Sequence, residues 1–207
     1  MQTQLCWFRN DLRVRDNPAL SNALASGPTR AFYIATPEQW LLHDDAPIKL
    51  DFWRRNLIEL SSELRKINVE LLFFQVADYK EIPKLLQLLL RCLKVSQLHY
   101  NRELPLNERL RDESVNEVCS RQGVKVSSFD DQLLVPQQSA LNKSSLPFKV
   151  FTPFARKLLS LIQNNPSLYE EQASESGNTL TLPSAPTLPH QCELADISWP
   201  QPRQKWS

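Results

Sequence analysis

Residues 5–35, LCWFRNDLRVRDNPALSNALASGPTRAFYIA, contain the pattern that decides the fold class. Residues 5–8 form a short apolar run, as in a buried strand, and residues 31–35 form a second run of the same kind. Between them, Asn17 stands where a helix N-cap is expected, and Pro18 occupies the first helical position, which proline favours. The stretch therefore predicts a strand, a polar loop, a helix and a second strand.

The same alternation continues to about residue 130. One apolar stripe with spacings of three and four residues marks the next helix, and it comprises Leu50, Trp53, Leu57, Leu60, Leu64 and Ile67. Further strands are expected at residues 70–76, 97–100 and 124–129, with helices at about 80–93 and 106–121 between them. Such βαβ units form a parallel sheet with right-handed crossovers. We predict an α/β fold with a doubly wound, five-stranded parallel sheet of Rossmann-like type, and we expect the stripe to face that sheet.

The pattern changes after Leu134. Residues 135–150 have the character of a loop, and one more amphipathic helix is expected to start at Thr152-Pro153. From Ser174 the composition turns to serine, threonine and proline, which predicts a linker that is extended or poorly ordered. We divide the chain into an α/β domain at residues 1–135, a connecting loop and helix at 136–173, and a linker at 174–207.

Composition excludes several classes of function. The formal net charge is only +1, so the chain lacks the basic stripe with which nucleic-acid-binding modules neutralise phosphates. Three glycines, against roughly 14 expected from average usage, are too few for a glycine-rich phosphate loop. The four cysteines form no CxxC pair, so we expect neither a metal site nor a disulfide framework. No apolar run approaches the roughly 20 residues of a membrane span, so we expect a cytoplasmic protein. We also expect a monomer.

Two polar loops are candidate binding elements. In an open α/β sheet, ligands bind beyond the carboxyl ends of the strands, where the strand order reverses beside the first strand. Residues 9–16 and 101–108 follow the first and fourth strands, and both are crowded with charged and amide side chains. We therefore expect these loops to converge. His43 also follows a strand, whereas His99 lies inside one and is expected to be structural.

A simpler alternative stays open for each of these residues. Asn107 could be a helix N-cap and Glu108 a carboxylate in the first turn, while Arg111 and Asp112 could form an exposed helical face. No arrangement of a nucleophile with a base emerges, nor any metal-binding spacing, so no catalytic residue is assigned.

Specific motifs connect the chain to a known family. Residues 6–20, CWFRNDLRVRDNPAL, resemble the start of the photolyase and cryptochrome family, with its signature W-F-R-x-D-L-R followed by D-N-x-A-L. The segments that narrow the resemblance to bacterial cyclobutane-dimer photolyases with a folate antenna are YIATP at 33–37 with Gln39-Trp40, NER at 107–109 with Arg111-Asp112, and KVFTPF at 149–154. The similarity runs in family order to about residue 160.

The resemblance implies a two-domain enzyme, a deoxyribodipyrimidine photolyase that repairs cyclobutane pyrimidine dimers in UV-damaged DNA with light. Its N-terminal α/β domain helps to hold the antenna methenyltetrahydrofolate, and a helical domain binds FAD and flips the lesion out of the stack. Asn107 and Glu108 match the pterin-contacting pair of the family, and His43 matches a histidine near the same cleft. A carboxylate suits the pterin edge, because this edge offers two adjacent N–H donors.

The helical FAD domain is expected to follow the linker, and it is not in this sequence. We therefore expect the chain to be the antenna domain of a truncated or cloned enzyme, inactive alone. Two other readings stay open. One is a cryptochrome-type blue-light signalling protein on the same fold. The other is a stand-alone nucleotide-binding module, which the missing glycine loop argues against.

Overall fold

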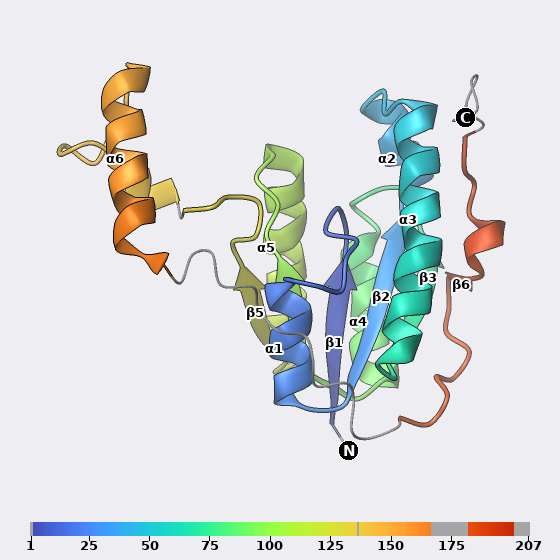
Figure 1. Cartoon of the computed structure of the whole chain (residues 1–207). Coiled ribbons are helices and arrows are strands. Elements are labelled where there is room, and N and C mark those ends of the chain that lie inside the picture. The colour runs from blue at the N-terminus through green and yellow to red at the C-terminus, as the bar shows by residue number, and fades with distance from the viewer. Residues whose placement is uncertain (1, 136, 167–181, 201–207) are drawn as a thin grey trace.

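The sheet organises the whole molecule. The computed structural model describes residues 2–135, 137–166 and 182–200. In chain order the elements are β1 (Thr3–Phe8), α1 (Pro18–Ser26), β2 (Thr29–Ala35), α2 (Pro37–Leu42), α3 (Pro47–Lys66), β3 (Glu70–Gln75), α4 (Ile82–Cys92), β4 (Val95–Asn101), α5 (Leu106–Arg121), β5 (Lys125–Phe129), η1 (Gln137–Ala140), α6 (Phe151–Asn164), β6 (Gln191–Cys192) and η3 (Leu194–Asp196). The strand order is β5-β4-β1-β2-β3-β6, and β1 to β5 are all parallel. The predicted doubly wound parallel sheet is confirmed (Figure 1).

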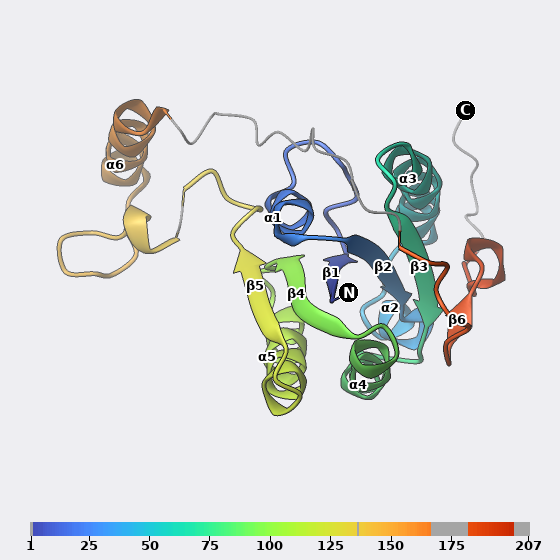
Figure 2. The ribbon, with the colours of Figure 1, turned by 90° about the horizontal axis from the view of Figure 1, so that it is seen from below.

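Helices cover both faces of this sheet, as Figure 2 shows from below. Along β1 the side chains alternate between the two faces, because successive residues of a strand point to opposite sides. Leu5 and Trp7 belong to the core under α4 and α5, whereas Cys6 and Phe8 belong to the core under α1 and α3. Because both faces are buried, residues 5–8 of β1 form a continuous apolar run, and only Thr3 and Gln4 at its start are polar.

The first helix begins and ends as the sequence indicates. The Asn17 side chain accepts a hydrogen bond from the Leu20 amide at 3.1 Å, and Pro18 opens the helix. Gly27 ends it with φ at +145°, a conformation that residues with a side chain rarely adopt. These caps direct the chain from the β1 loop back down to β2.

The four leucines of the predicted stripe face the sheet, whereas Trp53 and Ile67 are only partly buried. Leu50, Leu57, Leu60 and Leu64 are buried on α3. Trp53 is only partly buried, because it lies at the margin of the core, edge-on to Trp40 at 6.5 Å between ring centroids. The helix therefore buries its leucines against the sheet and leaves the tryptophan beside residues that follow the carboxyl ends of the strands.

The C-terminal segment differs from the expectation. Within the described residues 182–200, β6 pairs antiparallel with β3, with Cys192 beside Phe73, and so adds a sixth strand. Leu188 and Ile197 are each only 4% exposed, and Trp199 stacks on Trp40 at 5.1 Å. The chain here is extended as predicted, and isolated apolar residues anchor it to the sheet edge. For residues 174–181 and 201–207 the prediction lies outside the described residues.

The last helix stands apart from the layered body in Figures 1 and 2. None of the residues of α6 is buried, and Phe151 is 76% exposed. Among the helices of the described residues, none is long and apolar enough to cross a membrane.

Candidate functional site

The two predicted loops meet at the top of β1 and β4. The chain winds from β1 through β2 to β3 and then returns to β4 on the other side of β1, so the strand order reverses between β1 and β4. At this point the Asn101 side chain donates to Asp11 at 2.6 Å and accepts from the amide of Ala19 at 3.2 Å. The Asn10 side chain donates to Glu103. The expected convergence of the loops is confirmed.

A buried cluster of four charged residues lies beneath these loops. Its members are Arg9, Glu103, Arg111 and Asp112, each 7% exposed or less. The Asp112 Oδ1 accepts from Arg9 Nη1 at 2.7 Å and from Arg111 Nη2 at 2.8 Å, while Glu103 Oε2 accepts from Arg111 Nη2 at 2.7 Å. Two cations and two anions thus neutralise one another. The alternative that Arg111 and Asp112 form an exposed helical face is wrong, since both point into this cluster.

Aromatic rings cover the cluster. The Arg9 guanidinium lies 4.8 Å from the Trp7 ring and 4.6 Å from the Tyr100 ring, and the Arg111 guanidinium lies 4.8 Å from Trp7 and 4.9 Å from Tyr79. Burial alone would lower the pKa of Arg111, but the carboxylates of Asp112 and Glu103 outweigh it and raise that pKa. The cluster is therefore a buried, charged and hydrogen-bonded floor at the switch point, the place between β1 and β4 where the strand order reverses.

The structure brings two of the predicted site residues together above this floor. His43 follows α2 as its C-cap residue, and Asn107 lies in the first turn of α5. Their side chains meet, with Asn107 Nδ2 3.0 Å from His43 Nε2, and Gln39 Nε2 lies 2.6 Å from the same nitrogen. Because Pro105 is the N-cap of α5, Asn107 is not the capping residue that the alternative proposed.

The third predicted residue, Glu108, lies in the same turn. It is half-buried, and its Oε1 accepts a hydrogen bond from the Tyr79 hydroxyl at 3.1 Å. Among the residues that the structure describes, this is the only hydrogen bond to the Glu108 side chain. A carboxylate has about four lone-pair sites, so most of its acceptor capacity is open.

A small cavity lies between these groups, with a volume of about 180 Å³. Its walls combine aromatic rings with charges of both signs, contributed by Trp7, Arg9, Tyr33, Trp40, His43, Lys49, Trp53, Tyr79, Glu103, Glu108 and Arg111 among others. Pockets that enclose a whole drug-sized ligand measure roughly 300–1,000 Å³. This cavity therefore suits one flat, polar ring system, with the rest of a larger ligand lying outside.

Sequence reasoning missed several residues of this site. Tyr79 follows β3, and Trp40 lies in α2, so neither belongs to the two loops that the switch-point argument selected. The signal for Tyr79 was its place three residues beyond Val76, in a loop at the carboxyl end of a parallel strand. His99, by contrast, is confirmed as structural: it is fully buried in β4, with its Nε2 3.0 Å from the Gln4 Oε1.

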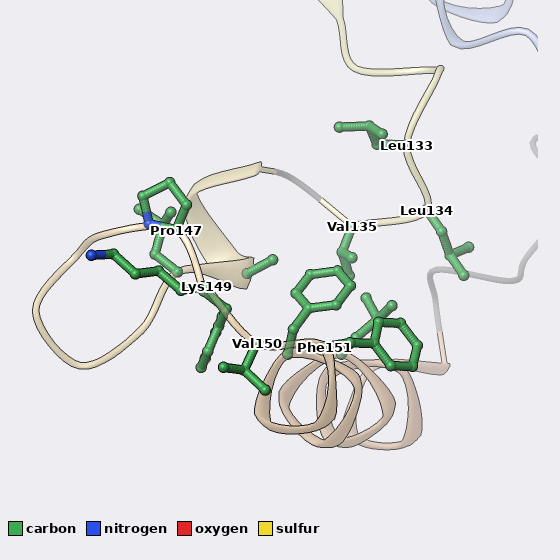
Figure 3. Close-up of a pocket in the computed structure, with 12 residues that line it drawn as sticks. Leu133, Leu134, Val135, Pro147, Lys149, Val150 and Phe151 are labelled. Carbon is green, nitrogen blue, oxygen red and sulfur yellow. The ribbon is translucent and has the colours of Figure 1, made fainter.

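A larger hollow of about 740 Å³ lies elsewhere, between the loop after β5 and the first turns of α6. Leu134, Val135, Val150 and Phe151 contribute to its wall, and in Figure 3 the charged end of Lys149 points away from them. A pocket so poor in polar groups offers little to orient a heterocycle. It is suited to an apolar surface instead.

The described residues contain no group of three or more histidine, cysteine, aspartate or glutamate side chains that could hold a metal ion. The four cysteines are free thiols, and burial raises the pKa of Cys6 and of Cys119, so these two stay protonated and unreactive.

Comparison with known proteins matches residues 4–177 to the DNA photolyase family. The deoxyribodipyrimidine photo-lyase of Vibrio cholerae is 45% identical over 77% of the chain, and cryptochrome-1 of Arabidopsis thaliana is 29% identical over 76%. A solved archaeal photolyase from Sulfolobus tokodaii, which holds two FAD molecules, aligns with a TM-score of 0.62 at 27% identity, over 75% of this chain and 34% of that one. The chain spans 34% of the Vibrio protein and 23% of the Arabidopsis protein.

Proposed function

Because this chain belongs to the DNA photolyase family, we propose that it is the antenna-binding α/β domain of a deoxyribodipyrimidine photolyase. In this proposal the whole enzyme repairs cyclobutane pyrimidine dimers in UV-damaged DNA with light. Residues 1–135 hold the antenna. Residues 136–173 form a connecting loop and helix, and residues 174–207 form the linker to a helical domain that binds FAD. The described part of this last segment runs along the sheet edge beside β3.

The observation that carries the antenna proposal is that the Glu108 carboxylate lines the cavity and accepts only one hydrogen bond within the described residues. A pterin presents an amino group and a ring N–H side by side, and a carboxylate can accept both hydrogen bonds at once. Glu108 has that capacity, because Tyr79 occupies only one side of Oε1. His43 and Asn107 lie alongside and offer further polar contacts at the rim. We therefore propose methenyltetrahydrofolate as the ligand.

The size and the walls of the cavity agree with this ligand. A volume of about 180 Å³ admits a ring system, while the exposed positions of His43 and Asn107 leave the rim open for the remainder of a folate. A bound antenna absorbs light and passes the excitation to the flavin. The residues of this chain bind and orient it, and none of them needs to make or break a bond.

Changing Glu108 tests the proposal. Glu108→Ala removes a charge-assisted, bidentate contact, which is worth about 1.5–3 kcal/mol and so weakens binding roughly ten- to hundredfold. The measurement is a titration of the chain with methenyltetrahydrofolate, followed by the ligand's fluorescence. Glu113→Ala is the matched control, because Glu113 is an exposed carboxylate of the same helix. Equal affinity of the two variants would show that Glu108 is only a first-turn carboxylate.

The apolar hollow of Figure 3 supports the proposed partner domain. Leu134, Val150 and Phe151 expose between 51% and 76% of their surface around it. An apolar surface of this kind is suited to packing against another domain, and we propose that the FAD-binding helical domain covers it. Contact with damaged DNA is then proposed to come through that domain, because this chain carries a net charge of only +1.

A cryptochrome-type light sensor is the second candidate function. The 29% identity to the Arabidopsis cryptochrome favours it, but the 45% identity to the Vibrio photo-lyase favours repair more strongly. Light-dependent loss of pyrimidine dimers, assayed with the native gene product, separates the two. Repair supports the photolyase, and light absorption by a bound flavin without repair supports the sensor.

A further inference from the structure

We propose that Tyr79 is a positioning residue, which fixes the Glu108 carboxylate so that its free oxygen faces the cavity. The inference rests on the proposed antenna function and names a residue that governs the affinity of that site. Tyr79 lies in the loop between β3 and α4, and neither the residue nor its loop was among the predicted site elements.

Tyr79 is in direct contact with Glu108. The Tyr79 hydroxyl donates to Glu108 Oε1 at 3.1 Å. Without this bond, the half-buried Glu108 side chain would have no hydrogen bond within the described residues to select one of its rotamers. With the bond, one oxygen is held, and the direction of the other is set by the planar carboxylate.

Tyr79 is itself held in place by its neighbours. One contact of its ring is with the Arg111 guanidinium at 4.9 Å, and Arg111 is bound by Glu103 and Asp112 in the buried cluster. The ring also lies edge-on to His43, at 6.5 Å between centroids, and packs against the apolar core under α4 and α5. Tyr79 thus links the buried charge cluster to Glu108 and joins the α2 side of the site to the α5 side.

The hydroxyl also keeps its proton under working conditions. Burial raises the pKa of Tyr79 well above its ordinary value, and the nearby Glu108 carboxylate raises it further against the opposing effect of Arg111. Tyr79 is therefore protonated at neutral pH and can act as a hydrogen-bond donor. Because the Tyr79 hydroxyl donates a hydrogen bond to Glu108, it can orient the carboxylate and leave the N–H groups of the ligand to bond with that carboxylate.

The test compares Tyr79→Phe with a matched control, Tyr100→Phe. Each substitution removes one hydroxyl that bonds a residue of α5 and keeps the ring, but the Tyr100 hydroxyl donates to Asn116, at 2.9 Å, instead of to Glu108. Binding of methenyltetrahydrofolate is measured by fluorescence titration for both variants. We expect Tyr79→Phe to weaken binding about two- to tenfold, as for the loss of one ordinary hydrogen bond, and Tyr100→Phe to leave it unchanged.

A double-mutant cycle separates positioning from other roles. In a Glu108→Ala background, Tyr79→Phe is expected to have no further effect, because there is no carboxylate left to orient. An equal loss in both backgrounds would mean that Tyr79 contacts the ligand or acts on the fold alone, and would overturn the proposal. Unchanged affinity in Tyr79→Phe, beside a weakened Glu108→Ala, would also overturn it but leave the antenna site standing. Unchanged affinity in Glu108→Ala itself would overturn the antenna site, and the positioning role with it.

Discussion

Removing Asp112 tests whether the buried charge cluster stabilises the switch point. Asp112 Oδ1 accepts three charge-assisted hydrogen bonds, from Arg9 Nη1 at 2.7 Å and from Arg111 Nε at 3.0 Å and Nη2 at 2.8 Å. In Asp112→Ala, Glu103 alone would face two buried guanidinium groups. Breaking a buried ion pair by removing one partner costs about 3–5 kcal/mol, because the remaining charge is left uncompensated.

Equilibrium unfolding in urea, followed by circular dichroism, measures this cost. A chain of this size loses about 2–4 °C in Tm per kcal/mol, so Asp112→Ala should also melt roughly 6–20 °C below the wild type. The matched control is Asp130→Ala, whose 2.9 Å pair with Arg102 is 39% and 49% exposed and is worth about 0–1 kcal/mol. A loss of under about 1 kcal/mol in Asp112→Ala would refute the reasoning, because the cluster would then be no stronger than a surface pair.

Two further predictions concern the core. Burial lowers the pKa of His99 to about 4, so between pH 6.5 and 4 the unfolded chain binds a proton that the folded chain does not. The free energy of unfolding should therefore decrease as the pH drops from 6.5 to 4, by up to about 3 kcal/mol from this residue. In His99→Gln, urea unfolding at a series of pH values should no longer show that part of the decrease. An unchanged pH profile would show that His99 charges within the fold. Leu57→Ala should cost about 2–5 kcal/mol in the same urea assay, because Leu57 is fully buried between α3 and the sheet, while exposed Ile58 should tolerate alanine. Equal costs at the two positions would mean that the stripe does not face the sheet.

The fold was predictable because its signals are local and periodic. Short apolar runs alternate with helices of regular spacing, and the Asn17-Pro18 cap marks where the first helix begins. The sixth strand could not be predicted in this way. It has only two residues, and the segment around it is held by single apolar side chains, Leu188, Ile197 and Trp199, with no period between them. Such anchors carry no pattern until the surface that they contact is known.

The candidate site was predictable only in part, for a similar reason. Loops after parallel strands meet at one edge, so the convergence of the residues after β1 and β4 followed from topology alone. The burial of Arg111 and Asp112 did not follow, because charged residues on a helix are mostly exposed. Tyr79 was missed because its partners come from α2 and α5, far away in the sequence, and only the folded chain brings them together.

The central claim is that a folate pterin binds in the cavity beside Glu108. The most direct measurement is a nitrogen-15 NMR titration of the chain with methenyltetrahydrofolate, with the shifted amides mapped onto the structure. We expect the shifts to gather at the carboxyl ends of the strands, around His43, Tyr79 and Glu108. Shifts confined to the apolar hollow between Leu133 and Leu158, or no shifts at saturating ligand, would contradict it.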